Sequence, residues 1–327
     1  MSRRAALIAG LALASCSGPG SEVATAKPDP TATASATERA APAISSPASA
    51  ALSAAPSTST SAASSLLPKG PFSCGSLTCE VFETPGAAFA HVLEDKPLVL
   101  ALGESHAQKG SEKVRSTTAR FTDELLPMLD GKASSLVLEL WIADGKCGKK
   151  TEREVQEKQK VVTEKQADEN QNEFVKLGEK AKSLSIVPFV LRPTCDEYEK
   201  IKKAGDNAVL EMLSMITRNM KDKATTLFRE TEKKQKGKMV VTYGGAMHND
   251  RAPKSGREGW SFAADLDALS GGRYVELDLV VPEFIKDTES WRSLPWYASY
   301  DATTFKDATV LITMGPRSYA LVFARSP

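Results

Sequence analysis

Long apolar runs, an excess of one charge and histidine are all scarce in this sequence, and each shortage is informative. After residue 16, no apolar run reaches the roughly 20 residues that a membrane-spanning helix requires. The 42 basic residues almost balance the 41 acidic residues, so the chain lacks the positive charge of a nucleic-acid-binding protein. We therefore expect no nucleic-acid partner. Only three histidines are present, which makes the position of each one a clue to function.

The N-terminus has the order of a bacterial export signal. Arg3 and Arg4 form a basic start, a short apolar stretch follows, and small residues lead to Cys16. The segment Leu13-Ala-Ser-Cys16 resembles the lipobox of bacterial lipoproteins, which implies that Cys16 is acylated and anchors the chain in a membrane. We predict a signal peptide over residues 1–15 and a place in the cell envelope. Ser17 does not look like an inner-membrane retention signal, which favours the outer membrane, on its periplasmic or surface face.

Composition divides the remainder of the chain into two parts. Residues 16–68 consist almost entirely of Ala, Ser, Thr and Pro. Such a segment cannot bury enough apolar surface to offset the entropy lost on ordering, so we predict a disordered linker. Residues 69–327 have an ordinary globular composition, and we predict that they form one domain.

Apolar periodicity in residues 69–327 predicts alternating strands and helices. Continuous apolar runs, typical of strands buried on both faces, cover residues 97–102, 135–141, 185–191, 238–243 and 273–281. Helical patterns begin at residues 111 and 196 and span 151–184, and a closing hairpin is expected from 308–314 and 318–324. The sequence therefore predicts an α/β fold: a mostly parallel sheet with helices on both faces and a C-terminal antiparallel hairpin.

Four cysteines follow Cys16, and four cysteines allow three pairings. Cys74 and Cys79 flank a short glycine-containing turn, whereas Cys147 and Cys195 each follow a predicted strand by a few residues. If those strands are parallel neighbours, both cysteines lie beyond the same sheet edge. We predict the disulfides Cys74–Cys79 and Cys147–Cys195. A zinc site is the alternative, but the spacings do not repeat and an exported protein favours disulfides.

Four side chains with chemical potential lie at or near the ends of predicted strands. Glu104 and His106 follow the first strand, Glu139 interrupts the second, and His248 follows the fourth. In a parallel sheet, ligands bind beyond the carboxyl ends of the strands, so these residues can share one crevice. Glu104, His106 and His248 would then hold a divalent metal ion. Alternatively, a histidine or glutamate would act as a general base on water without a metal.

Each of these side chains also has a purely structural explanation. Glu104 and His106 would serve the N-terminus of the helix that follows, and His248 would be an exposed loop residue. Glu139 would pair with an arginine elsewhere in the fold. The third histidine, His91, precedes the first strand and lies at the opposite end, so we leave it out of the site.

The ordered set of motifs resembles the ChaN-like/TIKI-TraB/erythromycin-esterase superfamily. The matching segments are Leu102-Gly-Glu-Ser-His106, Glu139 on the next strand, Arg218-Asn-Met220, and Val240-Val-Thr-Tyr-Gly-Gly-Ala-Met-His248. The resemblance implies an α/β fold and a crevice lined by the Glu, His and Arg side chains. It adds Arg218 to the candidate site, as a cation that holds an anionic substrate group or steadies a carboxylate. Activities in this superfamily comprise lactone hydrolysis, metal-dependent peptide cleavage and haem binding.

Two departures from the family pattern narrow these activities. The spacing from Gly103 to His106 is closest to the ChaN-like haem-uptake branch, and His106 and His248 would then be the haem-binding pair. However, the second histidine that some ChaN-like members carry is replaced by Gln108-Lys-Gly110. Asn219 also stands where many members have aspartate. The missing histidine weakens a haem site and a metal site with three histidines.

The sequence thus leads to a functional hypothesis with alternatives. We expect an exported lipoprotein with a hydrolase domain, of the esterase or metallopeptidase class, acting on a small molecule or a peptide with or without a divalent metal. Glu104 and His106 would activate water, while Glu139, Arg218 and His248 would position the substrate or the metal. The first alternative is a haem- or metal-binding lipoprotein without turnover. The second is a non-catalytic surface scaffold.

Overall fold

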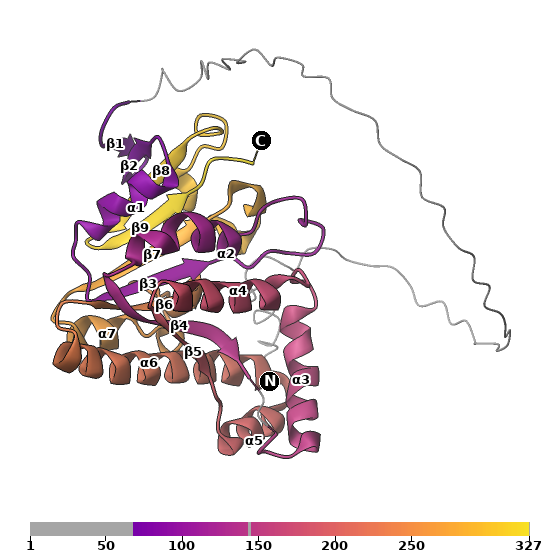
Figure 1. The fold of residues 1–327 in the computed structure, drawn as a ribbon. Helices are drawn as coiled ribbons and strands as arrows, with labels where there is room; N and C mark the ends of the chain where they lie inside the picture. The colour runs from indigo at the N-terminus through magenta and orange to yellow at the C-terminus, as the bar shows by residue number, and fades with distance from the viewer. Residues whose placement is uncertain (1–67, 143–144, 327) are drawn as a thin grey trace, which may run out of the picture.

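A computed structural model describes residues 68–142 and 145–326 (Figure 1). The predicted signal peptide, Cys16 with its lipid anchor and nearly all of the predicted linker lie outside the described residues. Those predictions therefore stay predictions, as does the single-domain boundary at residue 69.

The centre of the fold is a nine-stranded sheet with the strand order β1-β2-β8-β9-β7-β3-β6-β4-β5. The run β5-β4-β6-β3-β7-β9 is parallel throughout, whereas β8, β2 and β1 join by antiparallel pairing. The strands are β1 Phe72–Cys74, β2 Leu77–Phe82, β3 Val99–Glu104, β4 Ala133–Trp141, β5 Val187–Leu191, β6 Met239–Gly245, β7 Tyr274–Val280, β8 Thr309–Gly315 and β9 Ser318–Val322.

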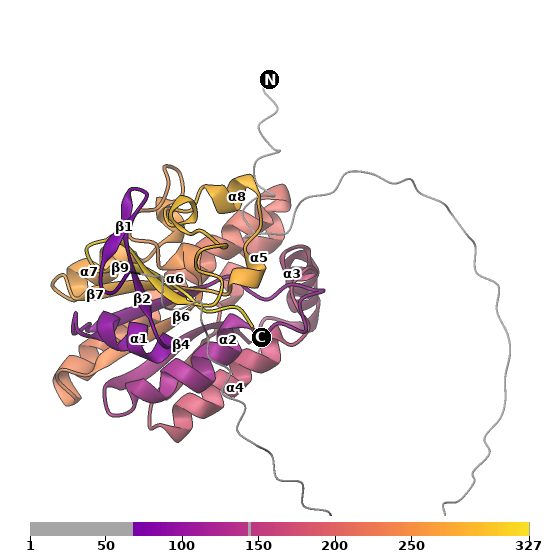
Figure 2. The ribbon, with the colours of Figure 1, turned by 90° about the horizontal axis from the view of Figure 1, so that it is seen from above.

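Helices cover both faces of this sheet (Figures 1 and 2). One face packs its apolar side chains against α1, α4 and the segment Phe121–Leu129 that follows α2, and the other face packs against α6 and α7. The helices are α1 Pro85–Leu93, α2 Thr117–Arg120, α3 Lys149–Thr163, α4 Asn170–Ser183, α5 Cys195–Lys203, α6 Ala208–Lys234, α7 Ala263–Leu269 and α8 Glu289–Arg292. The predicted fold class, including the C-terminal hairpin of β8 and β9, is confirmed.

Strand position explains two features of the sequence. β3 lies between β6 and β7 with every residue buried, which is why its sequence is continuously apolar up to its last residue, Glu104. β5 lies at the edge of the sheet and contains Pro188. Because proline cannot donate to a neighbouring strand, an edge is where the sheet tolerates it. The sequence analysis missed β1 and β2, which are short and lie at the opposite edge.

Both predicted disulfides are present, Cys74–Cys79 in the β1–β2 hairpin and Cys147–Cys195 beyond the ends of β4 and β5. β4 and β5 are parallel neighbours, as the pairing required. The second disulfide joins the start of α3 to the start of α5. These two helices and the first part of α6 form a small apolar cluster of their own beyond the edge strand.

The helical predictions needed two corrections. The helix expected from residue 111 begins only at Thr117, where the Ser116 side chain accepts a hydrogen bond from Ala119 N–H. It continues as a π-helix over Phe121–Leu125 and a 3₁₀-helix over Leu126–Leu129, because Pro127 has no N–H for an α-helical bond. The charged segment 151–184 forms two helices rather than one, with a loop between α3 and α4.

No helix in the two described ranges combines the length and the hydropathy that crossing a membrane requires.

Candidate active site

The carboxyl ends of three adjacent parallel strands bring the candidate residues together. Glu104 ends β3, Glu139 lies near the end of β4, and β6 lies between these two strands and ends at Gly245. Glu104 and Gly245 are partners in the β3–β6 register. His248 follows β6 after one turn of 3₁₀-helix. The strand ends at which the sequence analysis placed these residues therefore lie at the same edge of the sheet.

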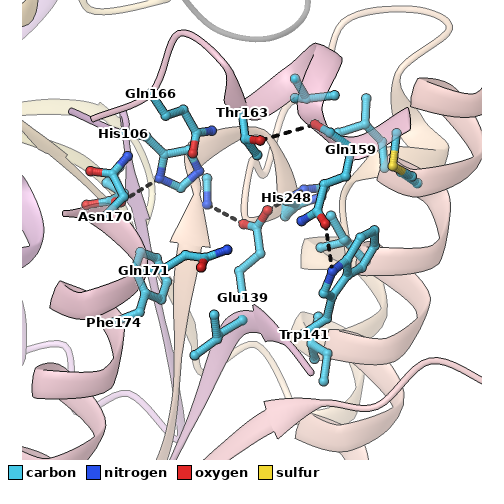
Figure 3. Close-up of a pocket in the computed structure, with 18 of the residues that line it drawn as sticks. His106, Glu139, Trp141, Gln159, Thr163, Gln166, Asn170, Gln171, Phe174 and His248 are labelled. Carbon is cyan, nitrogen blue, oxygen red and sulfur yellow. Dashed lines mark hydrogen bonds and ion pairs between the residues drawn. The ribbon is translucent and has the colours of Figure 1, made fainter. Parts of the chain in front are cut away.

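Gly245 marks the point at which the side chains converge. A Cβ atom added at this glycine would lie 3.5 Å from Glu139 Oε2, 3.8 Å from His106 Nε2 and 4.0 Å from His248 Cδ2. Two imidazoles and a carboxylate therefore surround one small volume (Figure 3). The two histidines, distant in sequence, face the same cavity.

His106 is held from behind by Glu104. The His106 Nδ1 atom lies 2.7 Å from Glu104 Oε1. The other carboxylate oxygen, Oε2, accepts hydrogen bonds from the hydroxyl groups of Thr118 at 2.8 Å and Tyr243 at 2.5 Å. Because a carboxylate accepts, Nδ1 of His106 carries a proton. Glu104 thus fixes the orientation of the ring and directs Nε2 into the cavity.

The same contact changes the acidity of His106. Burial alone would lower the pKa of the imidazole, but the hydrogen bond and the charge of Glu104, aided by the charge of Glu139, outweigh it and raise the pKa from 6.5 to about 9. His106 is therefore an imidazolium at neutral pH. Its Nε2–H is a proton donor that faces the cavity.

Glu139 remains a carboxylate although it is largely buried. Burial raises its pKa, but the neighbouring imidazoles of His248 and His106 and the N–H of Gly245 outweigh burial and lower the pKa from 4.5 to about 2. The Gly245 N–H donates to Glu139 Oε2 at 2.6 Å. Glu139 Oε1 lies 3.6 Å from His248 Nε2, which is an ion-pair distance and too long for a direct hydrogen bond.

His248 is oriented from the opposite side of the sheet. Its Nδ1 lies 3.0 Å from the Trp260 carbonyl oxygen and 2.9 Å from the Thr217 hydroxyl. A carbonyl oxygen only accepts, so the proton belongs on Nδ1. The Nε2 atom of His248 then faces Glu139 Oε1. The 3.6 Å between these two atoms leaves them well placed to share one water molecule or substrate hydroxyl.

Gly244 makes the position of Glu139 possible. A Cβ at Gly244 would lie 2.4 Å from Glu139 Oε2 and 2.7 Å from Glu139 Cβ. Any larger residue at position 244 would displace the carboxylate from the Gly245 N–H. Glycine at position 244, directly before Gly245 at the end of β6, is thus required by the close approach of Glu139.

The cavity has a volume of about 170 Å³, and its walls differ in chemistry. Glu104, His106, Glu139 and His248 line its floor. Apolar residues line the side of α6 and β5, whereas the side of α3 and α4 carries uncharged amides. Part of both helices of the charged segment borders the cavity, through Gln159, Thr163, Asn170, Gln171 and Phe174.

Arg218 is not brought to this site. Its guanidinium is partly exposed, lies 3.2 Å from Glu211 and 3.6 Å from Glu197 on α5, and does not line the cavity. The contact with Glu197 is an ion pair between helices. His91, which the sequence analysis set aside, lies on α1 beside Glu80 and Glu94, away from the cavity.

The predicted metal ligands do not form one coordination site. The described residues contain no group of three or more His, Cys, Asp or Glu side chains arranged to hold a metal ion. Glu104 gives both carboxylate oxygens to His106, Thr118 and Tyr243. It therefore acts behind His106 and is not a third ligand beside the two histidines. The residues as placed do not fit the divalent metal of the sequence hypothesis.

Three functional contacts escaped the sequence analysis. Thr118 and Tyr243 hold Glu104, and Thr217 holds His248. Tyr243 directly precedes the two glycines that end β6, so its position near the strand end could have marked it as a site residue. Nothing in the local sequence distinguishes Thr118 or Thr217 from other helical threonines, because their role depends on packing between distant elements.

Comparisons of the chain with protein-family models, with curated proteins and with solved structures find no match.

Proposed function

We propose that this chain is a hydrolase that cleaves an ester-type acyl bond. In this proposal His106 is the proton donor and His248 is the proton acceptor. The observation that carries the proposal is the convergence of His106 Nε2, Glu139 and the His248 ring on one point beside Gly245. A proton donor and a proton acceptor on either side of a carboxylate are the groups that general acid–base hydrolysis requires. The motif resemblance to the ChaN-like/TIKI-TraB/erythromycin-esterase superfamily, which includes lactone hydrolases, supports the same class.

The roles follow from the hydrogen bonds. A water molecule between His248 Nε2 and Glu139 would lose a proton to Nε2 as its oxygen bonds to the acyl carbon. His106 Nε2–H would stabilise the negative charge on the carbonyl oxygen and then protonate the leaving alcohol oxygen as the ester C–O bond breaks. The products are one acid and one alcohol. Proton exchange with solvent would restore both imidazoles. Glu104 would position His106 rather than activate water itself.

We also propose that the protein works outside the cytoplasm, anchored through acylated Cys16. The two disulfides support this location, because such bonds persist in oxidising compartments. A Cys16→Ser variant should lose the N-terminal lipid in intact mass spectrometry and leave the membrane fraction. Membrane fractionation of that variant equal to the wild type would contradict the anchor without touching the hydrolase proposal.

The three histidines provide a matched test of the hydrolase proposal. We expect hydrolysis of p-nitrophenyl butyrate by the full chain to fall at least about 100-fold in His106→Asn and in His248→Asn, the typical contribution of a general acid or base. His91→Asn, the control on α1, should keep wild-type activity. Circular dichroism would confirm that all three variants fold. No turnover above the buffer rate by the wild type, or equal turnover by all three variants, would contradict the proposal.

A further inference from the structure

The cavity above the catalytic groups has two unlike walls, and neither wall carries a strong positive charge. Among the described residues that line it, none is Lys or Arg. The charged lining groups are Glu104, Glu139 and His106, and His106 already has Glu104 as a partner. A charged ligand group along either wall would therefore lose its hydration without gaining a counter-ion, which is costly.

One wall is apolar and built mainly by the first turns of α6. Val209, Leu213 and Ile216 recur at helical spacing and are only half-buried, so one stripe of the helix faces the cavity. Leu191 at the end of β5 and Val162 on α3 extend the same surface. An acyl chain is the ligand part that such an aliphatic stripe would stabilise.

The side of α4 and the loop before it is uncharged and mainly polar, with Phe174 as its apolar member. Five carboxamide side chains line the cavity: Gln108, Gln159, Gln166, Asn170 and Gln171. Three of them are held in place by hydrogen bonds. The Gln159 carbonyl accepts from Trp141 Nε1 at 3.1 Å, Asn170 donates to the Ala107 carbonyl at 3.1 Å, and Gln108 donates to the His106 carbonyl at 2.8 Å. Figure 3 shows Gln166 and Gln171 on the same side of the cavity as His106. Carboxamides donate and accept hydrogen bonds, which suits hydroxyl groups without favouring either charge.

From this arrangement we propose that the substrate is an uncharged acyl ester with a hydroxylated alcohol part. The acyl chain would lie along the α6 stripe, the hydroxyl groups would contact the carboxamides of α3, α4 and the loop between them, and the ester carbonyl would lie over Gly245. This inference rests on the proposed function and adds the class of its substrate.

The first test compares esters that differ in charge. 1-Butyrylglycerol is neutral and hydroxylated, butyrylcholine places a cation on the alcohol side, and p-nitrophenyl hydrogen succinate places an anion at the end of the chain of p-nitrophenyl butyrate. We expect kcat/KM to be at least about tenfold higher for each neutral ester than for its charged counterpart. Equal rates for neutral and charged esters would overturn the substrate class and leave the hydrolase proposal standing.

Paired variants test the two walls separately. Leu213→Ala should reduce the preference for octanoyl over acetyl esters several-fold, whereas Leu210→Ala, on the same helix but not lining the cavity, should leave it unchanged. Gln171→Lys should raise the relative rate for the succinate ester, and Gln156→Lys, exposed on α3, should not. Identical behaviour of each pair would overturn the assignment of that wall.

Binding separates a wrong substrate class from a wrong reaction. Trp141 lines the cavity, so 1-octanoylglycerol should change the tryptophan fluorescence of the full chain, and Trp141→Phe should abolish that change. Binding without turnover would contradict the hydrolase proposal but support the ligand class. Neither binding nor turnover would overturn both.

Discussion

Two groups of buried carboxylates on the same sheet differ in their partners, and the difference decides their charge. Glu139 on β4 has two imidazoles and a backbone N–H around it, and its pKa falls to about 2. Glu276 and Asp278 on β7 lie close to each other and to Asp250. Burial raises the pKa of Glu276 to about 7, and burial together with the charge of Glu276 raises the pKa of Asp278 well above its usual range.

Glu139, unlike Asp278, has the charge and the position that catalysis requires. Glu139 keeps its negative charge in a cavity that a substrate can enter. Burial favours the protonated form of Asp278 by raising its pKa. Asp278 lies beside Asn249, whose Nδ2 donates to it at 3.4 Å and whose Oδ1 has no hydrogen-bond partner among the described residues. The β7 group therefore belongs to the packing of the sheet. A strand-end carboxylate becomes a candidate catalytic group only where a cationic partner is built beside it.

The largest expected effect is the contrast between Glu139→Gln and Asp278→Asn. Glu139→Gln removes the charge between the two histidines and should lower ester hydrolysis about 100-fold. Asp278→Asn replaces a carboxyl group whose pKa is raised by burial with a neutral group of the same shape and should change the rate less than about threefold. Steady-state kinetics with p-nitrophenyl butyrate decide the point. Equal losses in the two variants would remove the distinction between the groups.

The second-largest expected effect is a loss of folding stability at alkaline pH. The pKa of His106 is raised in the folded state from 6.5 to about 9. Its contribution is therefore fully present below pH 6.5 and is lost as the pH rises through about 9. We expect the free energy of unfolding to fall by about 2 kcal/mol, which is less than the full pKa shift implies because the ring edge faces solvent in the cavity. Urea unfolding at several pH values should show this loss in the wild type, and His106→Asn should flatten it.

A smaller loss with the same sign should come from the β7 group. The pKa of Glu276 is raised from 4.5 to about 7, so its contribution is present below pH 4.5 and is lost as the pH rises through 7. Because the group is coupled to Asp278, we expect an effect on the order of 1 kcal/mol. Glu276→Gln should remove the decline near pH 7 while leaving the decline near pH 9. An unchanged profile would show that Glu276 titrates normally.

The smallest effect is expected for Arg218. Its ion pairs with Glu197 and Glu211 are partly exposed, and such pairs contribute about 0–1 kcal/mol. Arg218→Ala should reduce thermal stability slightly and change kcat/KM less than about threefold. A tenfold loss of activity would instead restore the role that the family resemblance implied for this residue.

The sequence predicted the fold and much of the site because both depend on position along strands. Continuous apolar runs located the parallel strands, and the strand ends located His106, Glu139 and His248. The contacts that hold Glu104 and His248 in place were not predictable, since they come from Thr118 and Thr217 on other elements. Arg218 illustrates the opposite error. Its motif suggested a site residue, but its position on α6 directs it to the acidic residues of α5 and α6.

The most direct test of the site is the titration of the His106 ring by nuclear magnetic resonance. With three histidines in the chain, single His→Asn variants suffice to assign the ring signals. The structure predicts that His106 titrates at a pKa of about 9 in the wild type and at a lower pKa in Glu139→Gln, because that variant removes one of the charges that raise it. A wild-type pKa near 6.5 that Glu139→Gln leaves unchanged would show that the two side chains do not share a site.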